Sequence, residues 1–153
     1  MSDTVSPKIR SRMMAGIRGK DTKPEILVRH LLHERGFRYR LHRKDLPGKP
    51  DIVLPKYSAV VFVNGCFWHG HDCRFFKLPG TRTEWWAAKL EQNRSRDRKN
   101  VGQLRDAGWR VLIVWECAMR DPGSIPPDTL GARISTWLKS RNGMKEIRGG
   151  ELP

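Results

Sequence analysis

The chain has 153 residues, which is enough for one domain with a sizeable core and too few for two full domains. Its 30 Lys and Arg against 16 Asp and Glu give a formal net charge of +14, which favours a polyanionic partner but fits ribosomal proteins, membrane-surface proteins and nucleases alike. No apolar run is long enough to span a bilayer and no secretory signal pattern is present, so we expect a cytoplasmic protein with no membrane segment.

The spacing of apolar residues predicts alternating helices and strands. The predicted helices are 6–17, 22–35, 83–108 and 128–139, and the predicted strands are 37–41, 51–54, 59–63 and 109–115. Thr22 and Glu25 have the spacing of a capping box, and Gly36 is a natural helix end. The nearly all-apolar segment 59–63 is typical of a strand that is buried on both faces. This order of elements predicts an α/β fold with a mixed sheet flanked by helices.

All three cysteines of the chain can be ligands of one metal ion. Cys66, His71 and Cys73 lie on one short loop, and Cys117 follows the predicted strand 109–115. Three thiolates and one imidazole form a closed tetrahedral set, the usual shell of structural zinc. The alternative is that the cysteines fill the core as small apolar residues and that His71 is incidental. The irregular, glycine-bearing loop favours zinc, and an odd and small number of cysteines in a cytosolic protein favours a metal or free thiols over disulfides.

Three further residues are candidates for chemistry. Asp51 opens one predicted strand, beside another that ends at Val63 and Asn64, and nucleases of the restriction type hold Mg²⁺ on such a carboxylate. The alternative is a turn aspartate after Gly-Lys-Pro. His69 lies between zinc ligands, where it can act as a general acid or base or bind a phosphate, or it is an exposed loop histidine. Glu25 has a plain structural explanation as the capping-box carboxylate.

The aromatic residues allow two interpretations. Phe67, Trp68, Trp85 and Trp86 can belong to the core, or they can insert into nucleic acid, as the basic composition suggests. Two adjacent tryptophans on a helix cannot both face inward, so at least one of Trp85 and Trp86 is expected to be exposed or at an interface. The basic run 94–99 is either an ordinary solvated helix face or a row of phosphate contacts.

Taken together, these motifs resemble one family across nearly the whole chain. The matching segments are R-S-x-M-M, L-P-G-K-P-D, V-F-V-N-G-C-F-W-H-G-H-D-C, T-R-T-E-W-W and G-W-R-V-L-I-V-W-E-C. The chain resembles the very-short-patch-repair (Vsr) endonucleases, which nick DNA beside T:G mismatches. The resemblance implies a restriction-endonuclease-like fold with a structural zinc ion on Cys66, His71, Cys73 and Cys117.

The resemblance also implies roles for single residues. It implies Mg²⁺ on Asp51 and on the backbone carbonyl of Val63, with His69 in acid–base or phosphate contact and Glu25 near the reaction centre. It implies an aromatic wedge beside the mismatch and an N-terminal helix in the opposite groove; the wedge residues are Phe67, Trp68 and Trp86, and the helix enters near Met14. The best-known members carry Thr-His where this chain has Val63 and Asn64. An amide cannot shuttle a proton, which leaves His69 as the one candidate acid–base histidine, while Asn64 can orient a water or a phosphate.

We therefore expect a Mg²⁺-dependent, strand-specific endonuclease that cuts 5′ of the mispaired thymine and leaves a 5′-phosphate. Such mismatches arise from deamination of 5-methylcytosine, which implies a companion cytosine-5 methyltransferase, and a MutL-type repair protein is a further expected partner. We expect a monomer at the nucleoid, with a DNA-contacting arm at 1–20, an endonuclease domain at 21–140 and a disordered polar tail at 141–153. The alternatives are a nuclease of broader mismatch or structured-DNA specificity and a non-catalytic zinc-stabilised DNA-binding module, which has no need of a carboxylate at Asp51.

Overall fold

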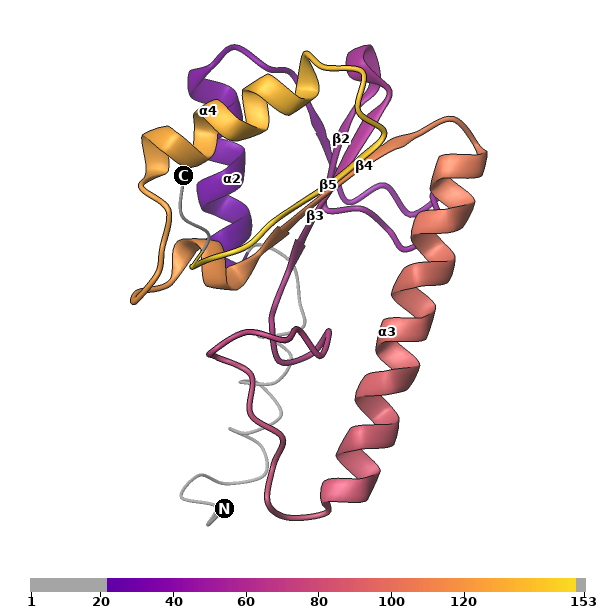
Figure 1. The fold of residues 1–153 in the computed structure, drawn as a ribbon. Helices are drawn as coiled ribbons and strands as arrows, with labels where there is room; N and C mark the ends of the chain where they lie inside the picture. The colour runs from indigo at the N-terminus through magenta and orange to yellow at the C-terminus, as the bar shows by residue number, and fades with distance from the viewer. Residues whose placement is uncertain (1–21, 151–153) are drawn as a thin grey trace.

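The computed structural model describes residues 22–150, which form a five-stranded sheet with helices on both faces (Figure 1). The strands are β1 Arg40–Leu41, β2 Ile52–Leu54, β3 Ala59–Asn64, β4 Arg110–Trp115 and β5 Met144–Ile147. The helices are α2 Lys23–Glu34, α3 Thr83–Asp106 and α4 Pro127–Leu138, with short 3₁₀ turns at Pro55–Tyr57 and Glu116–Met119. The arm at 1–20, with its predicted helix at 6–17, lies outside the described residues.

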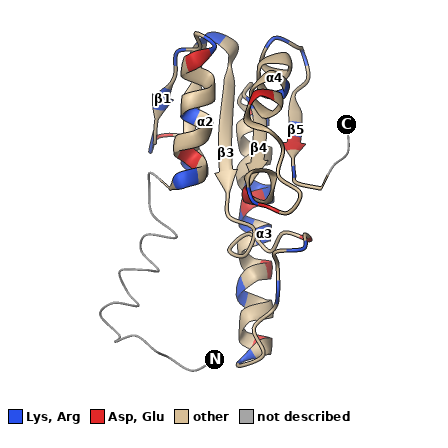
Figure 2. Cartoon of the chain, turned by 90° about the vertical axis from the view of Figure 1, so that its left-hand side faces the viewer, with Lys and Arg blue, Asp and Glu red and all other residues tan. Residues whose placement is uncertain are grey.

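The sheet is mixed, as the order of predicted elements indicated. Its strands follow the order β1-β2-β3-β4-β5, with β1 and β5 at the two edges (Figure 2). The first three strands are antiparallel neighbours, whereas β3–β4 and β4–β5 are parallel. The parallel pair β3–β4 is connected through the long helix α3, because parallel strands need a crossover.

Each face of the sheet is covered by its own layer. Helices α2 and α4 cover one face, and the C-terminal part of α3 covers the other (Figure 1). Consecutive residues of β3 divide between the two cores, because side chains alternate along a strand: Val60 belongs to the α3 side and Val61 to the α2–α4 side. This arrangement confirms the prediction that segment 59–63 is buried on both faces. The N-terminal half of α3 extends beyond the sheet, alongside the loop that follows β3 (Figure 1).

The prediction of a disordered tail at 141–153 was wrong for the part that the structure describes. Met144–Ile147 forms β5, and Ile147 is fully buried beside Val114 of β4. The sequence M-K-E-I carries little strand signal, since an edge strand needs only one buried face. Glu146 accepts a hydrogen bond from the indole N–H of Trp115 at 2.9 Å, so a polar residue here has a structural role. Residues 151–153 lie outside the described part.

No helix among residues 22–150 is both long enough and apolar enough to cross a membrane.

Candidate active site and metal centre

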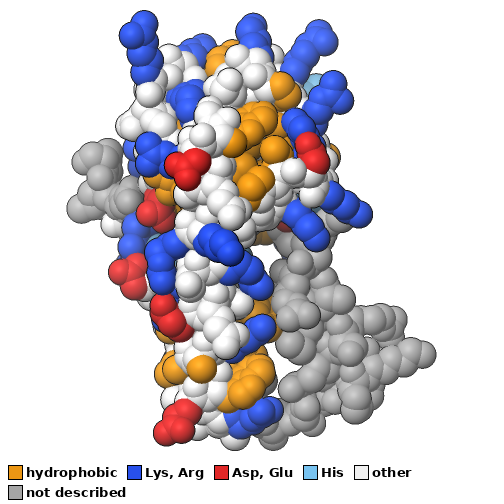
Figure 3. Space-filling view, turned by 90° about the vertical axis from the view of Figure 1, so that its right-hand side faces the viewer, with side chains coloured by type: hydrophobic (Ala, Val, Ile, Leu, Met, Phe, Trp, Pro, Cys, Tyr) orange, Lys and Arg blue, Asp and Glu red, His pale blue; other side chains and the backbone are white. Residues whose placement is uncertain are grey.

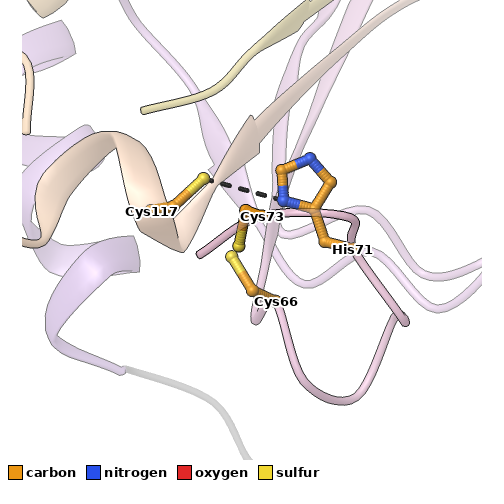
Figure 4. A group of neighbouring side chains, drawn as sticks. All are labelled: Cys66, His71, Cys73 and Cys117. Atoms are coloured by element: carbon orange, nitrogen blue, oxygen red, sulfur yellow. Dashed lines mark hydrogen bonds between the residues drawn. The ribbon is translucent and has the colours of Figure 1, made fainter. Parts of the chain in front are cut away.

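The four predicted zinc ligands lie together at one end of the sheet (Figure 4). One potential ligand atom from each of Cys66, His71, Cys73 and Cys117 lies within 4.8 Å of all the others. The Sγ atom of Cys117 is 3.6 Å from Nδ1 of His71. A tetrahedral zinc ion with bonds of about 2.3 Å to sulfur and about 2.1 Å to nitrogen holds such a pair roughly 3.6 Å apart. The donor set and its spacing therefore fit zinc.

The parallel pairing of β3 with β4 brings these ligands together. Cys66 follows the end of β3 and Cys117 follows the end of β4, and Asn64 is paired in register with Trp115 at those two ends. The loop then folds back, since the backbone N–H of His71 donates to the carbonyl of Cys66 at 2.9 Å. The imidazole of His71 stacks on the indole of Trp115, with centroids 3.9 Å apart and planes 4° from parallel. The stacking fixes the ring with Nδ1 towards Cys117.

The protonation of this cluster also suits a metal ion. Burial raises the pKa of the Cys66 thiol, and burial likewise raises the pKa of Cys117. Burial lowers the pKa of His71, which keeps the imidazole in the neutral form that binds metal. Without a cation Cys66 and Cys117 are therefore thiols, and zinc binding releases protons as their thiolates form. The alternative of core-filling cysteines explains the burial but not the convergence of four donors.

A second cluster joins three elements near the start of β2. Potential ligand atoms of Glu25, His42 and Asp51 lie within 4.8 Å of one another. Asp51 immediately precedes β2, and its Oδ2 accepts a hydrogen bond of 2.7 Å from the backbone N–H of Val63. Glu25 comes from the first turn of α2, where its side chain is 5% exposed. The antiparallel pairing of β2 with β3 thus brings Asp51 to residue 63.

The helix-capping explanation does not account for the carboxylate of Glu25. The hydroxyl of Thr22 accepts from the backbone N–H of Glu25 at 3.4 Å, so the cap is present. The carboxylate, however, accepts from the guanidinium of Arg29 at 3.0 Å and lies 3.6 Å from Nε2 of His42. Glu25 therefore supports the cluster as well as the helix end.

His42 belongs to this cluster but could not be predicted from the sequence. No motif marks it, and it follows the two-residue strand β1 with a left-handed φ of 51°. Its backbone N–H donates to the carbonyl of Asp51 at 3.2 Å, because Leu41 and Ile52 are cross-strand partners. The one available signal was the hairpin. In an antiparallel pairing of 37–41 with 51–54, the residue that follows the first strand can lie opposite the start of the second, as His42 lies opposite Asp51.

The environment of Asp51 makes its carboxylate hard to ionise. Its pKa is raised to about 7, chiefly by burial and further by the charge of Glu25. The hydrogen bond from Val63 opposes this shift, as do the positive charges of His69 and Arg29. A bound divalent cation would also lower the pKa of Asp51, because its positive charge stabilises the ionised carboxylate. The buried carboxylate therefore favours a bound cation at neutral pH.

His69 is held by a carboxylate from α3. Its Nδ1 lies 2.5 Å from Oδ2 of Asp97, and both side chains are roughly one quarter exposed. Because an ionised carboxylate only accepts, Nδ1–H is the donor and Nε2 remains for a reacting group. The sequence analysis treated Asp97 only as part of the basic run 94–99. A carboxylate within a basic helix, one element away from a loop histidine, was the available signal.

The basic run is partly structural. Arg94 donates to the carbonyl of Gly70 at 2.8 Å and to Glu91 at 3.0 Å. The bond to Gly70 ties α3 to the loop 66–73, which carries Cys66, His71 and Cys73 and is called the metal loop below. Arg98 also pairs with Glu91, at 3.1 Å. Lys99 is exposed on the same helix. Arg94 therefore has a structural contact with the loop, whereas Arg98 is an exposed residue in a surface ion pair, and the interpretation of the run as phosphate contacts stays a prediction.

The predicted wedge residues form one aromatic cluster between the metal loop and the start of α3. The ring of Phe67 lies 5.2 Å from that of Trp68 and 5.3 Å from that of Trp86. The buried amide of Asn93 donates to the carbonyl of Trp68 at 2.9 Å and so fixes this part of the loop. Trp85 is 47% exposed, which confirms that one of the two adjacent tryptophans faces outward. Met14 lies outside the described residues.

Loss of one cysteine should remove the metal and destabilise the domain. We expect Cys117→Ala to contain less than one zinc per chain and to unfold at a markedly lower temperature, because structural zinc contributes folding free energy directly. His69→Ala, a change in the same loop that removes no ligand, should keep one zinc. Metal analysis and thermal unfolding test this, and a zinc-free wild type with an intact fold would contradict it.

Stability should depend on pH through Asp51. Its pKa of about 7 in the folded chain exceeds the ordinary value of 3.8, so the folded state holds a proton that the unfolded state releases. The protonated carboxyl of Asp51 therefore contributes stability that is fully present below about pH 4 and is lost as the pH rises through about 7. We expect the melting temperature of Asp51→Asn relative to wild type to increase between pH 5 and 8 without added Mg²⁺. Parallel curves would show that Asp51 ionises normally.

Comparison with known proteins identifies the family. The family DNA mismatch endonuclease Vsr matches residues 2–75. The type II nicking enzyme V.XorIIP of Xanthomonas oryzae is 51% identical over 125 residues, which cover 82% of this chain and 92% of that protein. DNA mismatch endonuclease Vsr of Escherichia coli is 40% identical over 147 residues, with coverage of 96% and 94%. The type II nicking enzyme V.NmeAIP of Neisseria meningitidis is 46% identical over 121 residues, with coverage of 79% and 86%. The chain therefore belongs to the Vsr family of DNA mismatch endonucleases.

Proposed function

We propose that the protein is a Mg²⁺-dependent endonuclease that nicks one DNA strand 5′ of the mispaired thymine in a T:G mismatch. The observation that carries this proposal is the carboxylate of Asp51, partly buried beside Glu25 and hydrogen-bonded by the backbone N–H of Val63. A non-catalytic binding module has no use for such a carboxylate. The names of the relatives, a mismatch endonuclease and nicking enzymes, support the same reaction.

Each residue of the candidate active site has a separate proposed role in the nicking reaction. Asp51 and the backbone carbonyl of Val63 hold Mg²⁺, which when bound polarises the scissile phosphate and lowers the pKa of a water. Asp97 keeps the ring of His69 in one orientation, so that Nε2 can take a proton from the attacking water or bind the phosphate. Asn64 is buried at the end of β3 and carries no titratable group, so its part is to orient a water or a phosphate. The products are a 5′-phosphate and a 3′-hydroxyl.

The aromatic cluster supplies the mismatch reading. Phe67, Trp68 and Trp86 enter the stack beside the T:G pair, while Met14 enters from the opposite groove. Unstacking one step costs a few kcal/mol and costs least where pairing is already faulty, so the mismatch itself favours insertion. Figure 3 shows apolar side chains gathered near the start of α3, at the lower end of a face over which Lys and Arg are spread. Phe67, Trp68 and Trp86 are half-buried and Trp85 is exposed, so aromatic rings reach the surface beside cations, as a DNA-inserting surface needs.

The biological setting follows from the substrate. T:G mismatches of this kind come from deamination of 5-methylcytosine, so we propose a functional link to a cytosine-5 methyltransferase that sets the sequence context. A MutL-type repair protein is a further proposed partner. The protein would act as a monomer on nucleoid DNA.

Removal of the Asp51 charge should abolish the reaction but not binding. We expect Asp51→Asn to fold, to bind T:G duplex as well as wild type, and to nick it several orders of magnitude more slowly with Mg²⁺, because the amide keeps the shape and loses the charge that holds the cation. A labelled duplex read on a denaturing gel measures the nicking. Near-normal cleavage by the variant would place the active site elsewhere.

Removal of one wedge ring should affect mismatch discrimination alone. We expect Trp68→Ala to reduce the preference for T:G over matched duplex by roughly 1–3 kcal/mol, the usual value of one base–aromatic stack. The slope of affinity against salt should stay nearly unchanged, since no phosphate contact is lost. Lys99→Ala, on the exposed face of α3, is the control and should change matched and mismatched binding equally. Equal weakening by Trp68→Ala would make Trp68 a general contact or core residue.

A further inference from the structure

We propose that residues 148–150, which follow β5, form the outer shell of the metal centre and retain the zinc ion on it. Arg148 and Gly149 act through hydrogen bonds to a ligand and to the metal loop, so they are positioning residues and not ligands. Zinc on the four-residue cluster is the one assumption, and the nicking reaction of the proposed function does not enter.

Gly149 makes a direct hydrogen bond to one of the ligands. Its backbone N–H donates to Sγ of Cys117 at 3.2 Å. A metal-bound thiolate is negatively charged, so a backbone donor stabilises it and fixes its direction. Loss of such an outer-shell partner typically weakens metal binding by about 10–100-fold. Cys117 is therefore oriented by a segment that supplies no ligand of its own.

The close approach at Gly149 leaves no room for a side chain. A Cβ atom there would overlap the carbonyl oxygen of Cys117 and would lie 3.1 Å from that of Gly123. Gly149 is not among the glycines with a positive φ, so its backbone conformation does not require glycine. The contact with Cys117 is therefore the reason for glycine here, and a larger residue must move the donor away from the sulfur.

Arg148 ties the same segment to the metal loop. Its guanidinium donates to Oδ1 of Asp72 at 2.8 Å through Nη1 and to the carbonyl of Asp72 at 2.9 Å through Nη2. Asp72 stands between the ligands His71 and Cys73, so the bond to its carbonyl fixes the backbone that carries both ligands. The side chain of Asp72 is 86% exposed, and an ion pair in water contributes little. The second bond, to the backbone, is what holds the loop.

The segment is anchored at both of its ends. Before it, Glu146 of β5 accepts from the indole N–H of Trp115 at 2.9 Å, and Trp115 stacks on the imidazole of His71. At its far end, the backbone N–H of Gly150 donates to the carbonyl of Gly123 at 2.9 Å. These contacts keep the segment against the metal centre.

A cavity of about 260 Å³ lies beside the metal centre. Its lining includes two ligands, Cys73 and Cys117, and the segment 148–150. Cys73 is only partly buried, whereas Cys66 and Cys117 are buried. The cavity is therefore the side from which a chelator reaches the ion, and the segment forms one wall of that route.

The rate of zinc release tests the assignment. Zinc-loaded protein is mixed with an excess of a chromogenic chelator such as pyridylazoresorcinol, and the absorbance of the chelator's zinc complex gives the rate. We expect Arg148→Gln and Gly149→Ala to release zinc about tenfold faster than wild type, or more. Two matched controls should release it at the wild-type rate. Lys145→Gln removes a charge from β5 itself, and Gly102→Ala adds a Cβ that meets open space on α3.

Cobalt substitution distinguishes positioning from general stability. Co²⁺ in place of zinc gives a thiolate-to-metal charge-transfer band, whose energy rises when a hydrogen bond stabilises the thiolate. We expect the band of Gly149→Ala to move to lower energy and that of Gly102→Ala to stay at the wild-type position. General destabilisation would weaken the band without moving it.

A wild-type release rate in either variant removes that residue from the outer shell, and wild-type rates in both, with an unmoved cobalt band, overturn the proposal. Equal acceleration by Lys145→Gln would also overturn it, because the effect would then be one of surface charge. If Gly149→Ala does not fold, as judged by circular dichroism, Arg148→Gln and Arg148→Lys decide by their rates. Lysine keeps the charge but cannot donate to both oxygens of Asp72. A zinc-free wild type would refute the outer shell and leave the nicking reaction to its own assay.

Discussion

The parallel pairing of β3 with β4 is the constraint on which the rest of the structure depends. It places the ends of the two strands side by side at Asn64 and Trp115, so the segments that follow must share one small volume. The metal centre closes there, with Cys66 after one strand and Cys117 after the other. The antiparallel partner β2 starts at the same end, which puts Asp51 against Val63. One strand pairing therefore positions both the metal centre and the candidate active site.

The two centres are coupled through one short loop. His69 lies between the ligands Cys66 and His71, so the metal shell limits how far its backbone can move, and Asp97 from α3 then fixes the ring. Asn93, also on α3, holds the carbonyl of Trp68 in the same loop. If zinc binds here, its loss should for this reason release His69, the proposed acid–base residue, together with Trp68 of the proposed wedge. We therefore propose that a zinc ion on this cluster would position the candidate active site as well as stabilise the fold.

Much of the fold and site could be predicted because the informative residues are local in sequence. The sequence predicts the loop with three candidate metal ligands within eight residues. It also predicts the apolar strand at 59–63 and the helix at 83–108. What could not be predicted depends on pairing across distance. His42 faces Asp51 only because β1 and β2 form a hairpin, and β5 has a pattern too weakly apolar to be distinguished from a loop. Asp97 had the right residue type, but its partner lies 28 positions away.

The central claim is that this site cuts DNA and does so because of a mismatch. A panel of end-labelled duplexes that differ in one base pair tests it most directly: T:G, U:G, the other mismatches and matched controls, each incubated with wild-type protein with and without Mg²⁺. The proposed function predicts a single nick in the thymine strand of the T:G duplex, dependent on the cation, with matched DNA left intact. Cleavage of matched and mismatched duplexes at equal rates, or of both strands, would contradict the claim.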